Sequence, residues 1–323
     1  MWIAISNKKE DTTKIPTALI FFDRGCWFNH NLKIIEMHRL ILGTLFIFSL
    51  NLAQAQAPLE KSLLWEISGK GISKPSYLFG TIHLICPKDF SLSDPLKKAI
   101  SKTEQLALEI DMDDPGLMGA MTKTMFMTGG KTLKGIFTET DYSRLQRFYQ
   151  DSIGMDITTF DRAKPFVLMG PLFNKVLDCQ PQSYEMELMS LANKQNSEVI
   201  GLETIEEQMA IFDTVPYTQQ AKMLISIIDS LPNAKTEFHK LVELYKKQDL
   251  DALNTLSMKS EFGMDSQNEV MLFQRNKAWI DRIAKMITKK STFIAVGAAH
   301  LGGERGVIAL LRKEGYIVRA VAK

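Results

Sequence analysis

The stretch TFIAVGAAHLGGERGVIALLRKEGYIVRAV, residues 292–321, contains a strand, a helix and a second strand in close succession. Residues 292–296 and 316–321 are apolar runs of strand length, and residues 306–313 between them have helical periodicity. Two strands that are joined through a helix run parallel in a sheet. The stretch therefore predicts a parallel pairing of these two strands in an α/β fold.

Strands and helices alternate in the same way upstream of this stretch. Residues 63–68 and 76–79 flank a turn-rich segment and predict an antiparallel hairpin. The other predicted elements are buried strands at 106–110 and 198–202, a helix that opens with Asp94 as N-cap and Pro95, a helix that ends at Gly154, and helical stretches at 165–178, 184–194 and 205–287. The predicted class is α/β, with a mixed sheet, an active site at the strand ends and a helical insertion.

Residues 37–57 have the parts of a secretory signal peptide. The charged start at Met37 is followed by an apolar run at 40–52 and by small residues that suit cleavage after Ala55 or Ala57. The run is shorter than the roughly 20 residues that span a bilayer, although a buried helix or a membrane anchor is the alternative. We predict export to the periplasm or the extracellular space, with no membrane span after cleavage. Residues 1–36 are then a disordered, mis-assigned upstream start, and residues 58–323 form a single domain.

Composition and charge narrow the class of partner. The 323 residues are 45% hydrophobic and 24% charged, which is typical of a globular protein with a sizeable core. The chain has 39 Lys and Arg against 37 Asp and Glu, and six of these cations and four of these acids lie in residues 1–57. Residues 58–323 are therefore formally neutral. A nucleic-acid-binding protein needs a surplus of positive charge to neutralise phosphates, so we set this class of function aside. The expected partner is a peptide or small-molecule substrate, and the oligomeric state is left open.

Two of the three cysteines lie downstream of the predicted signal peptide. Cys86 and Cys179 are an even number in an exported chain, and an oxidising compartment favours a disulfide between them. Two separate buried thiols are an equal alternative, because the sequence does not show whether the two Cα atoms approach closely enough.

Two histidines follow strands in the same local pattern. Gly80 precedes His83 by three residues after the strand that ends at 79, and Gly297 precedes His300 by three residues after the strand that ends at 296. Glycine at this place lets the backbone turn tightly or approach a ligand. Ligands of α/β proteins bind outside the carboxyl ends of strands, so the pattern predicts a functional site there.

Two carboxylates are delivered to the same kind of position. Glu109 lies near the end of the strand at 106–110, and Glu203 follows the strand at 198–202. Two imidazoles with one or two carboxylates are a plausible set of ligands for a divalent metal that leaves room for water. Such a metal lowers the pKa of its bound water, and a free carboxylate can transfer protons. The predicted reaction is hydrolysis.

Each of these residues also has a structural interpretation. A single G-x-x-H pattern is a weak signal, and either histidine alone is more often a structural residue than a ligand. Thr204 and Glu207 fit a helix capping box, and the neighbouring Glu203 could simply favour the helix dipole. Arg275 would by default be an exposed arginine on a helix, and His239 is assigned no role.

An ordered set of motifs resembles the TraB/PrgY/GumN family. The motifs are LFGTIHL (78–84), LEID (108–111), GLETIEEQ (201–208), RN (275–276) and VGAAHL (296–301). The resemblance covers residues 62–321, and the family is related to the Tiki metalloproteases and more distantly to erythromycin esterases and ChaN haem-binding lipoproteins. It implies a Tiki-like, erythromycin-esterase-like α/β fold.

The resemblance also implies roles for particular residues. His83 and His300 match the paired histidines, Glu109 the family glutamate, Arg275 the family arginine, and Glu203 the G-L-E-T motif. Tiki members cleave peptides with a divalent metal such as manganese or cobalt, which implies Mn, Co or Zn here. His83, Glu109 and His300 are then the predicted metal ligands, with Glu109 as the third ligand or the general base. Arg275 would orient a carboxylate or stabilise an oxyanion.

The predicted function is an exported, metal-dependent hydrolase that acts on a peptide bond. Two alternatives stay open at this point. The first is a non-catalytic protein that binds a peptide or haem in the same cleft. The second is a metal-independent esterase in which His83 activates water as the general base.

Overall fold

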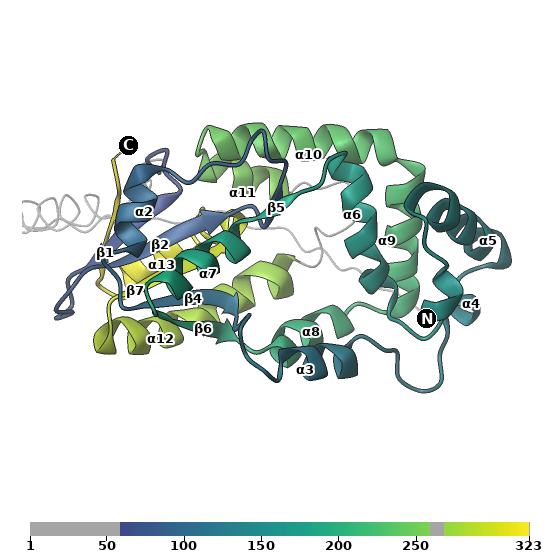
Figure 1. Ribbon diagram of the computed structural model, residues 1–323, viewed down its shortest axis with the longest axis horizontal. Helices are drawn as coiled ribbons and strands as arrows, with labels where there is room; N and C mark the ends of the chain where they lie inside the picture. The colour runs from purple at the N-terminus through teal and green to yellow at the C-terminus, as the bar shows by residue number, and fades with distance from the viewer. Residues whose placement is uncertain (1–58, 259–267, 323) are drawn as a thin grey trace, which may run out of the picture. The chain divides into compact units, whose positions relative to one another are not determined.

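The computed structural model describes residues 59–258 and 268–322 (Figure 1). The predicted upstream start, the signal peptide and Cys26 lie outside the described residues.

The described residues form a six-stranded mixed sheet with the order β6-β4-β7-β2-β1-β8. The strands are β1 (Leu64–Ser68), β2 (Ser76–Thr81), β4 (Gln105–Ile110), β6 (Glu198–Glu203), β7 (Thr292–Gly297) and β8 (Ile317–Ala320). β6, β4, β7 and β2 are mutually parallel neighbours, whereas β1 is antiparallel to both β2 and β8. The predicted α/β class with a mixed sheet and the hairpin of β1 and β2 are confirmed.

The predicted pairing of the two C-terminal strands is wrong. β7 and β8 run in the same direction, but β2 and β1 lie between them in the sheet. The burial patterns give the physical reason. Every residue of β7 is buried, as expected for a central strand that is covered on both faces, whereas β8 alternates between exposed and buried residues, as expected at an edge. The helix α13 (Val307–Lys313) therefore connects a central strand to the edge strand.

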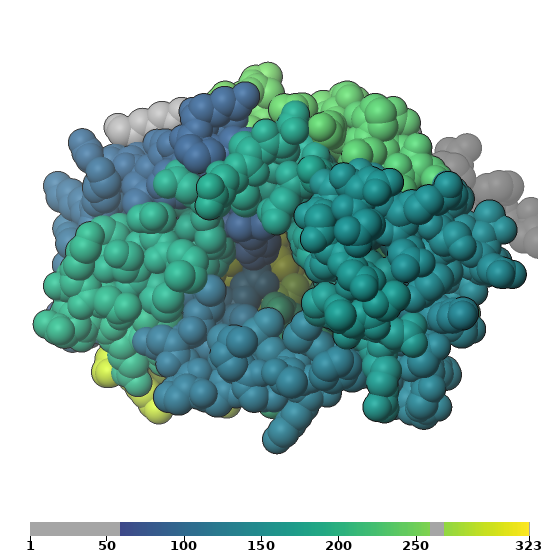
Figure 2. Space-filling view, turned by 45° about the vertical axis from the view of Figure 1, so that its right-hand side comes forward, coloured from purple at the N-terminus to yellow at the C-terminus, as the bar shows by residue number. Residues whose placement is uncertain are grey.

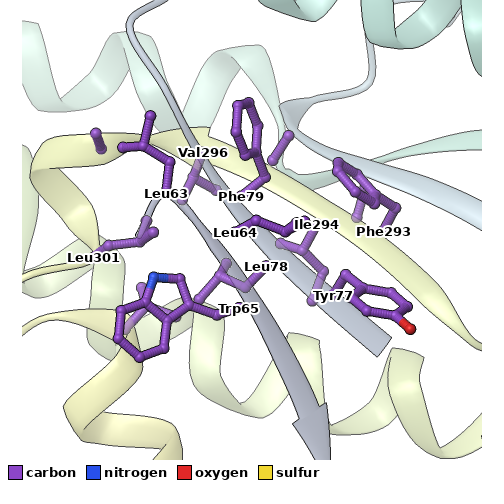
Figure 3. Packing of buried hydrophobic residues seen from close by; sticks show 14 of the residues in the cluster. Leu63, Leu64, Trp65, Tyr77, Leu78, Phe79, Phe293, Ile294, Val296 and Leu301 are labelled. Atoms are coloured by element: carbon purple, nitrogen blue, oxygen red, sulfur yellow. The ribbon is translucent and has the colours of Figure 1, made fainter. Parts of the chain in front are cut away.

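The main core surrounds the central strands (Figure 3). Leu78 of β2 and Ile294 of β7 are fully buried, and Figure 3 shows the side chains of these strands together with Trp65 and Leu301. Helix α7 (Tyr184–Lys194) packs against β4 and β6, and helix α12 (Gln274–Lys289) packs against β6 and α13. The helix α2 (Asp94–Ile100) also contributes to this core, although its N-cap is Ser93 and not Asp94 as predicted.

A second core lies entirely among helices. It contains Leu133, Leu145, Tyr149, Leu172 and Leu224, all of which are nearly or completely buried. The helices that supply or cover it are α4 (Leu133–Ile136), α5 (Glu139–Phe148), η1 (Tyr149–Ile153), α6 (Met169–Leu177), α9 (Tyr217–Asp229) and α10 (Leu231–Lys246). These helices leave the sheet after β4 and after β6, so they are the predicted helical insertion (Figure 1).

A disulfide joins Cys86 to Cys179, which decides between the two alternatives for these cysteines. Next to it, β3 (Leu84–Ile85) pairs in antiparallel fashion with β5 (Gln182–Ser183). Strands of two residues have no periodicity, so the sequence did not predict this pair. The pair and the disulfide connect the segment after β2 to the segment before α7.

Candidate active site

Three neighbouring parallel strands bring the predicted residues together at one edge of the sheet. β4 carries Glu109, β2 is followed by His83, and β7 is followed by the short helix η6 (Ala298–His300), which ends at His300. Because the sheet order places β7 between β4 and β2, the three carboxyl ends are adjacent. Figure 2 shows a hollow in the molecule with purple and yellow segments at its floor, the colours of the earliest described and the C-terminal parts of the chain.

Glu109 lies at the centre of this group. Its Oε1 accepts a hydrogen bond from the Gly297 amide at 2.8 Å and is 3.8 Å from Nε2 of His83 and 3.9 Å from Nε2 of His300. Its Oε2 accepts from Nη2 of Arg275 at 2.6 Å. The structure thus brings three of the other four predicted site residues, His83, His300 and Arg275, around the Glu109 carboxylate.

Gly297 is required by this close approach. A Cβ atom at position 297 would lie 3.1 Å from Nε2 of His83 and 3.4 Å from Oε1 of Glu109. A side chain at position 297 would therefore push His83 and Glu109 away from the end of β7, where the Gly297 amide binds Glu109. Gly80 has a related role, since its own Cβ would lie 3.1 Å from the backbone of Ala298.

His83 is held in an unusual backbone conformation. Its φ of +51° lies in the left-handed region, which non-glycine residues seldom adopt, and its carbonyl accepts from the Tyr184 amide at 3.2 Å. Its Nδ1 donates to Oε1 of Glu185 at 2.8 Å. Glu185 in turn accepts from the hydroxyls of Thr81 at 2.6 Å and Ser183 at 3.0 Å. Glu185 therefore orients the ring of His83 towards Glu109.

Sequence reasoning missed Glu185 because an acid in the first turn of a helix normally needs no further explanation. A signal was nevertheless present. Glu185, Leu188 and Ala192 have the spacing of one helix face, and all three are buried. An acid on an apolar face requires a partner, and here the partner is His83.

The charges around Glu109 set the protonation of His83. Partial desolvation of the imidazole opposes the charged form of His83, although its side chain is 56% exposed, but the hydrogen bond to Glu185 and the charges of Glu109 and Glu185 raise its pKa to about 9. Burial alone would raise the pKa of Glu109, yet the charge that His300 gains in acid, the positive charges of His83 and Arg275, and the Gly297 amide lower it to about 2. At neutral pH, His83 is therefore an imidazolium that faces a carboxylate.

His300 is in the opposite state. Its Nδ1 is 2.6 Å from Oδ1 of Asn276, and the Asn276 amide nitrogen donates to two backbone carbonyls, those of His300 and Arg305. Because Oδ1 can only accept, Nδ1 of His300 carries the proton and Nε2 accepts from Nη1 of Arg275 at 3.2 Å. The ring packs on Trp279, and its burial lowers the pKa of His300 to about 3. His300 is neutral at neutral pH.

Glu203 lies behind Arg275. Its carboxylate accepts from Nε of Arg275 at 3.0 Å and from Nη2 at 2.6 Å, and it also accepts from Trp279 and Gln208 at 3.1 Å each. These contacts make Glu203 a residue that positions Arg275. The interpretation of Arg275 as an exposed helical residue is wrong, since only 10% of its side chain is exposed. The capping box of Thr204 and Glu207 is confirmed.

A cavity of about 230 Å³ opens above these groups. Its polar lining consists of His83, Glu109, Gln208 and Arg275, and its apolar lining consists of Ile211, Phe212 and Met271. Phe212 is stacked on Phe166 with ring centroids 4.5 Å apart, which supports the apolar wall from behind. The site can therefore receive a substrate that presents both a polar and an apolar group.

The predicted metal ligands are not free to bind a metal in this arrangement. Ligands of a tetrahedral metal are roughly 3.3–3.6 Å apart, slightly closer than Glu109 is to either histidine. The lone pair on Nε2 of His300 is already used by Arg275, and Arg275 also contacts Glu109. Among the residues that the structure describes, no three His, Cys, Asp or Glu side chains form a group that could hold a metal ion. The donor types suit a divalent metal, but their present arrangement does not.

The TraB/PrgY/GumN family model matches residues 63–320. The chain belongs to this family. Two curated relatives are Metalloprotease TIKI2 of Danio rerio, 22% identical over 80% of this chain and 60% of its own length, and Metalloprotease TIKI1 of Homo sapiens, 23% identical over 80% of this chain and 61% of its own length. The chain thus spans about three fifths of the length of these TIKI proteins. Uncharacterized protein YbaP of Shigella flexneri is 25% identical over 74% of this chain and 89% of its own length.

No solved structure matches the chain. Across residues 59–258 and 268–322, no helix of this TraB/PrgY/GumN family member is both long and apolar enough to cross a membrane.

Proposed function

We propose that this protein is an exported hydrolase that cleaves peptide bonds at the edge formed by β2, β4 and β7. The observation that carries the proposal is the convergence of His83, Glu109 and Arg275 at one cavity, with the buried His300 in contact with Arg275. The match to proteins named metalloproteases favours a peptide over other substrates.

The spacing around Glu109 supports a bound water as the nucleophile. Distances of 3.8 and 3.9 Å from Oε1 to the two imidazole nitrogens are too long for direct hydrogen bonds, so Oε1 is free to accept a hydrogen bond from a water on its cavity side. The water oxygen attacks the carbonyl carbon of the substrate, and its proton passes to Glu109. When the C–N bond breaks, this proton passes from Glu109 to the leaving amine.

His83 has the properties of an electrophile. As an imidazolium, it donates from Nε2 to the substrate oxygen on which negative charge develops. This role differs from the alternative in which His83 acts as the general base, because a ring with a pKa of about 9 is already protonated at neutral pH.

Glu109 is a weak base in this arrangement, because a carboxylate with a pKa of about 2 has little affinity for a proton. Arg275 is one of the cations that lower this pKa, so withdrawal of its guanidinium would make Glu109 a stronger base. A divalent cofactor belongs to the proposal because the relatives are named metalloproteases, and Mn, Co or Zn are the metals that the family resemblance implies. His83, Glu109 and His300 would be its ligands, and in the arrangement described Arg275 already contacts two of them, Glu109 and His300.

Export is supported by two independent features. Residues 37–57 have the pattern of a signal peptide, and the disulfide between Cys86 and Cys179 suits an oxidising compartment. Sequencing of the N-terminus of the protein recovered from cells tests this part. A start at Gln56 or Pro58 supports export, and a start at Met1 contradicts it.

Incubation of the purified protein with a peptide mixture, followed by mass spectrometry of new termini, tests the activity. We expect cleavage by the wild type and none by Glu109→Gln, with the exposed His239→Ala as a control that stays active. Parallel samples with a chelator or with added Mn, Co or Zn measure the dependence on metal. Capture of peptide or haem without any product would instead favour the non-catalytic protein.

A further inference from the structure

Arg275 is fully engaged at the point where the predicted metal ligands meet. Its Nη1 donates to the Met271 carbonyl at 3.0 Å and to Nε2 of His300 at 3.2 Å. Its Nη2 donates to Glu109 and Glu203 at 2.6 Å each, and its Nε also donates to Glu203. One guanidinium thus uses both the carboxylate and the imidazole that a metal would need.

The charge balance explains why a cation must be present there. Glu109 and Glu203 are both buried, and two buried carboxylates without a counter-ion are strongly unfavourable. Arg275 lies within hydrogen-bond distance of both. A divalent ion at Glu109 and His300 would neutralise the same charge, and the two cations would repel each other at this short distance.

The surroundings allow Arg275 to leave without exposing an unpaired group behind it. Glu203 keeps Trp279 and Gln208 as donors when the guanidinium withdraws. Arg275 lies in the first turn of α12, directly after the π-helix η5 (Glu269–Phe273), whose Met271 carbonyl it contacts. π-helical turns are frequent at functional sites.

We propose that Arg275 is an internal competitor of a divalent metal for Glu109 and His300. The site binds a metal only when the guanidinium withdraws from these two residues, and without the metal Arg275 itself is the cation that completes the site. This inference rests on the proposed function, because it concerns the cofactor of the same site.

Titration of the purified protein with Mn²⁺ by calorimetry, with metal content by elemental analysis, tests the competition without measuring activity. We expect Arg275→Gln to bind Mn²⁺ at least tenfold more tightly than the wild type. Arg282→Gln is the matched control, since Arg282 lies on the same helix and pairs with Glu207 instead of the site. It should bind Mn²⁺ as weakly as the wild type. Equal affinities of Arg275→Gln and the wild type would overturn the proposal.

Two further variants keep the test decisive. If Arg275→Gln does not fold because Glu109 and Glu203 then face each other without a cation, the double variant Glu203→Gln, Arg275→Gln removes one of these charges. It should also bind Mn²⁺ at least tenfold more tightly than Glu203→Gln alone. Adding Glu109→Gln should abolish the gain, which places the ion at this site. A gain that persists without the Glu109 carboxylate would contradict the proposal.

The result is separable from that of the proposed function. Tighter Mn²⁺ binding by Arg275→Gln, with no cleavage of any peptide by the wild type, supports the competition and rejects the peptidase. Peptide cleavage by the wild type together with unchanged affinity of Arg275→Gln supports the peptidase and rejects the competition.

Discussion

The two G-x-x-H segments have the same local pattern and opposite surroundings. The His83 side chain is 56% exposed and donates to a carboxylate, that of Glu185, whereas the His300 side chain is 5% exposed and donates to the amide oxygen of Asn276. The first ring is charged at neutral pH and the second is neutral. The partner of Nδ1 and the degree of burial, neither of which belongs to the motif, therefore decide what each histidine can do.

The largest expected effect concerns activity, where the two histidines should be equivalent. His83→Ala removes the donor to the substrate oxygen, and His300→Ala removes the acceptor that holds Nη1 of Arg275 beside Glu109. Each should lower kcat/KM by about 10²–10⁴-fold, the usual range for such groups. Peptide cleavage assays measure this, with His239→Ala as the control. Retained activity in only one variant would assign catalysis to a single histidine.

The two substitutions should differ in their effect on stability. His300→Ala leaves a cavity beside Trp279 and an unpaired Asn276, so we expect a loss of about 2–4 kcal/mol. His83→Ala removes a ring that is more than half exposed and leaves Glu185 with the hydroxyls of Thr81 and Ser183 as donors, so its loss should be smaller, about 1–2 kcal/mol. Urea unfolding measures both values. Equal losses would show that burial does not distinguish the two positions.

Exchanging the carboxylate that contacts Nδ1 of His83 for an amide, and the amide that contacts Nδ1 of His300 for a carboxylate, should move the pKa values of the two histidines in opposite directions. Glu185→Gln removes a negative charge, so the pKa of His83 should fall from about 9 towards its ordinary value near 6.5. Asn276→Asp adds a negative charge, so the pKa of His300 should rise from about 3. Titration of the imidazole C–H signals by NMR measures both. An unmoved His83 pKa in Glu185→Gln would mean that Glu109 alone sets it.

The smallest expected effect is on the pH dependence of stability, to which His83 and His300 contribute with opposite signs. The pKa of folded His83 is raised, so its contribution is complete below about pH 6.5 and is lost as the pH rises towards about 9. The pKa of folded His300 is lowered, so its neutral form stabilises the fold above about pH 6.5, and this contribution is lost as the pH falls towards about 3.

Unfolding curves at about pH 3–9 measure these slopes, and each variant should flatten one side only. Glu185→Gln should reduce the loss above pH 6.5, and His300→Ala should reduce the loss below it. A profile that changes on both sides in Glu185→Gln would indicate that the two rings titrate as one unit.

Most of the strands were predictable because a buried strand is a local property. The runs at β2, β4, β6 and β7 are apolar, short and bounded by turn residues, and each forms the predicted strand. The order of strands is not local. The stretch 292–321 correctly predicts strand, helix and strand, but the place of β8 at the edge depends on β1 and β2, which are more than 200 residues away in the chain.

The candidate site likewise has features that are local in the sequence and features that depend on distant residues. The histidines and Glu109 have a recognisable position after strands, so their convergence follows from parallel pairing. Glu185 reaches His83 across 102 residues, through a disulfide and two-residue strands that have no sequence periodicity. Its role was hidden for that reason.

By itself the sequence determined the α/β class, the positions of the strands and the set of residues at their carboxyl ends, because periodicity and turn residues act over a few positions. The tertiary structure alone decided which histidine is charged, that Glu203 supports Arg275 and that Arg275 pairs with Glu109. These are properties of distances and burial between side chains far apart in the chain, and electrostatic energies depend on those distances.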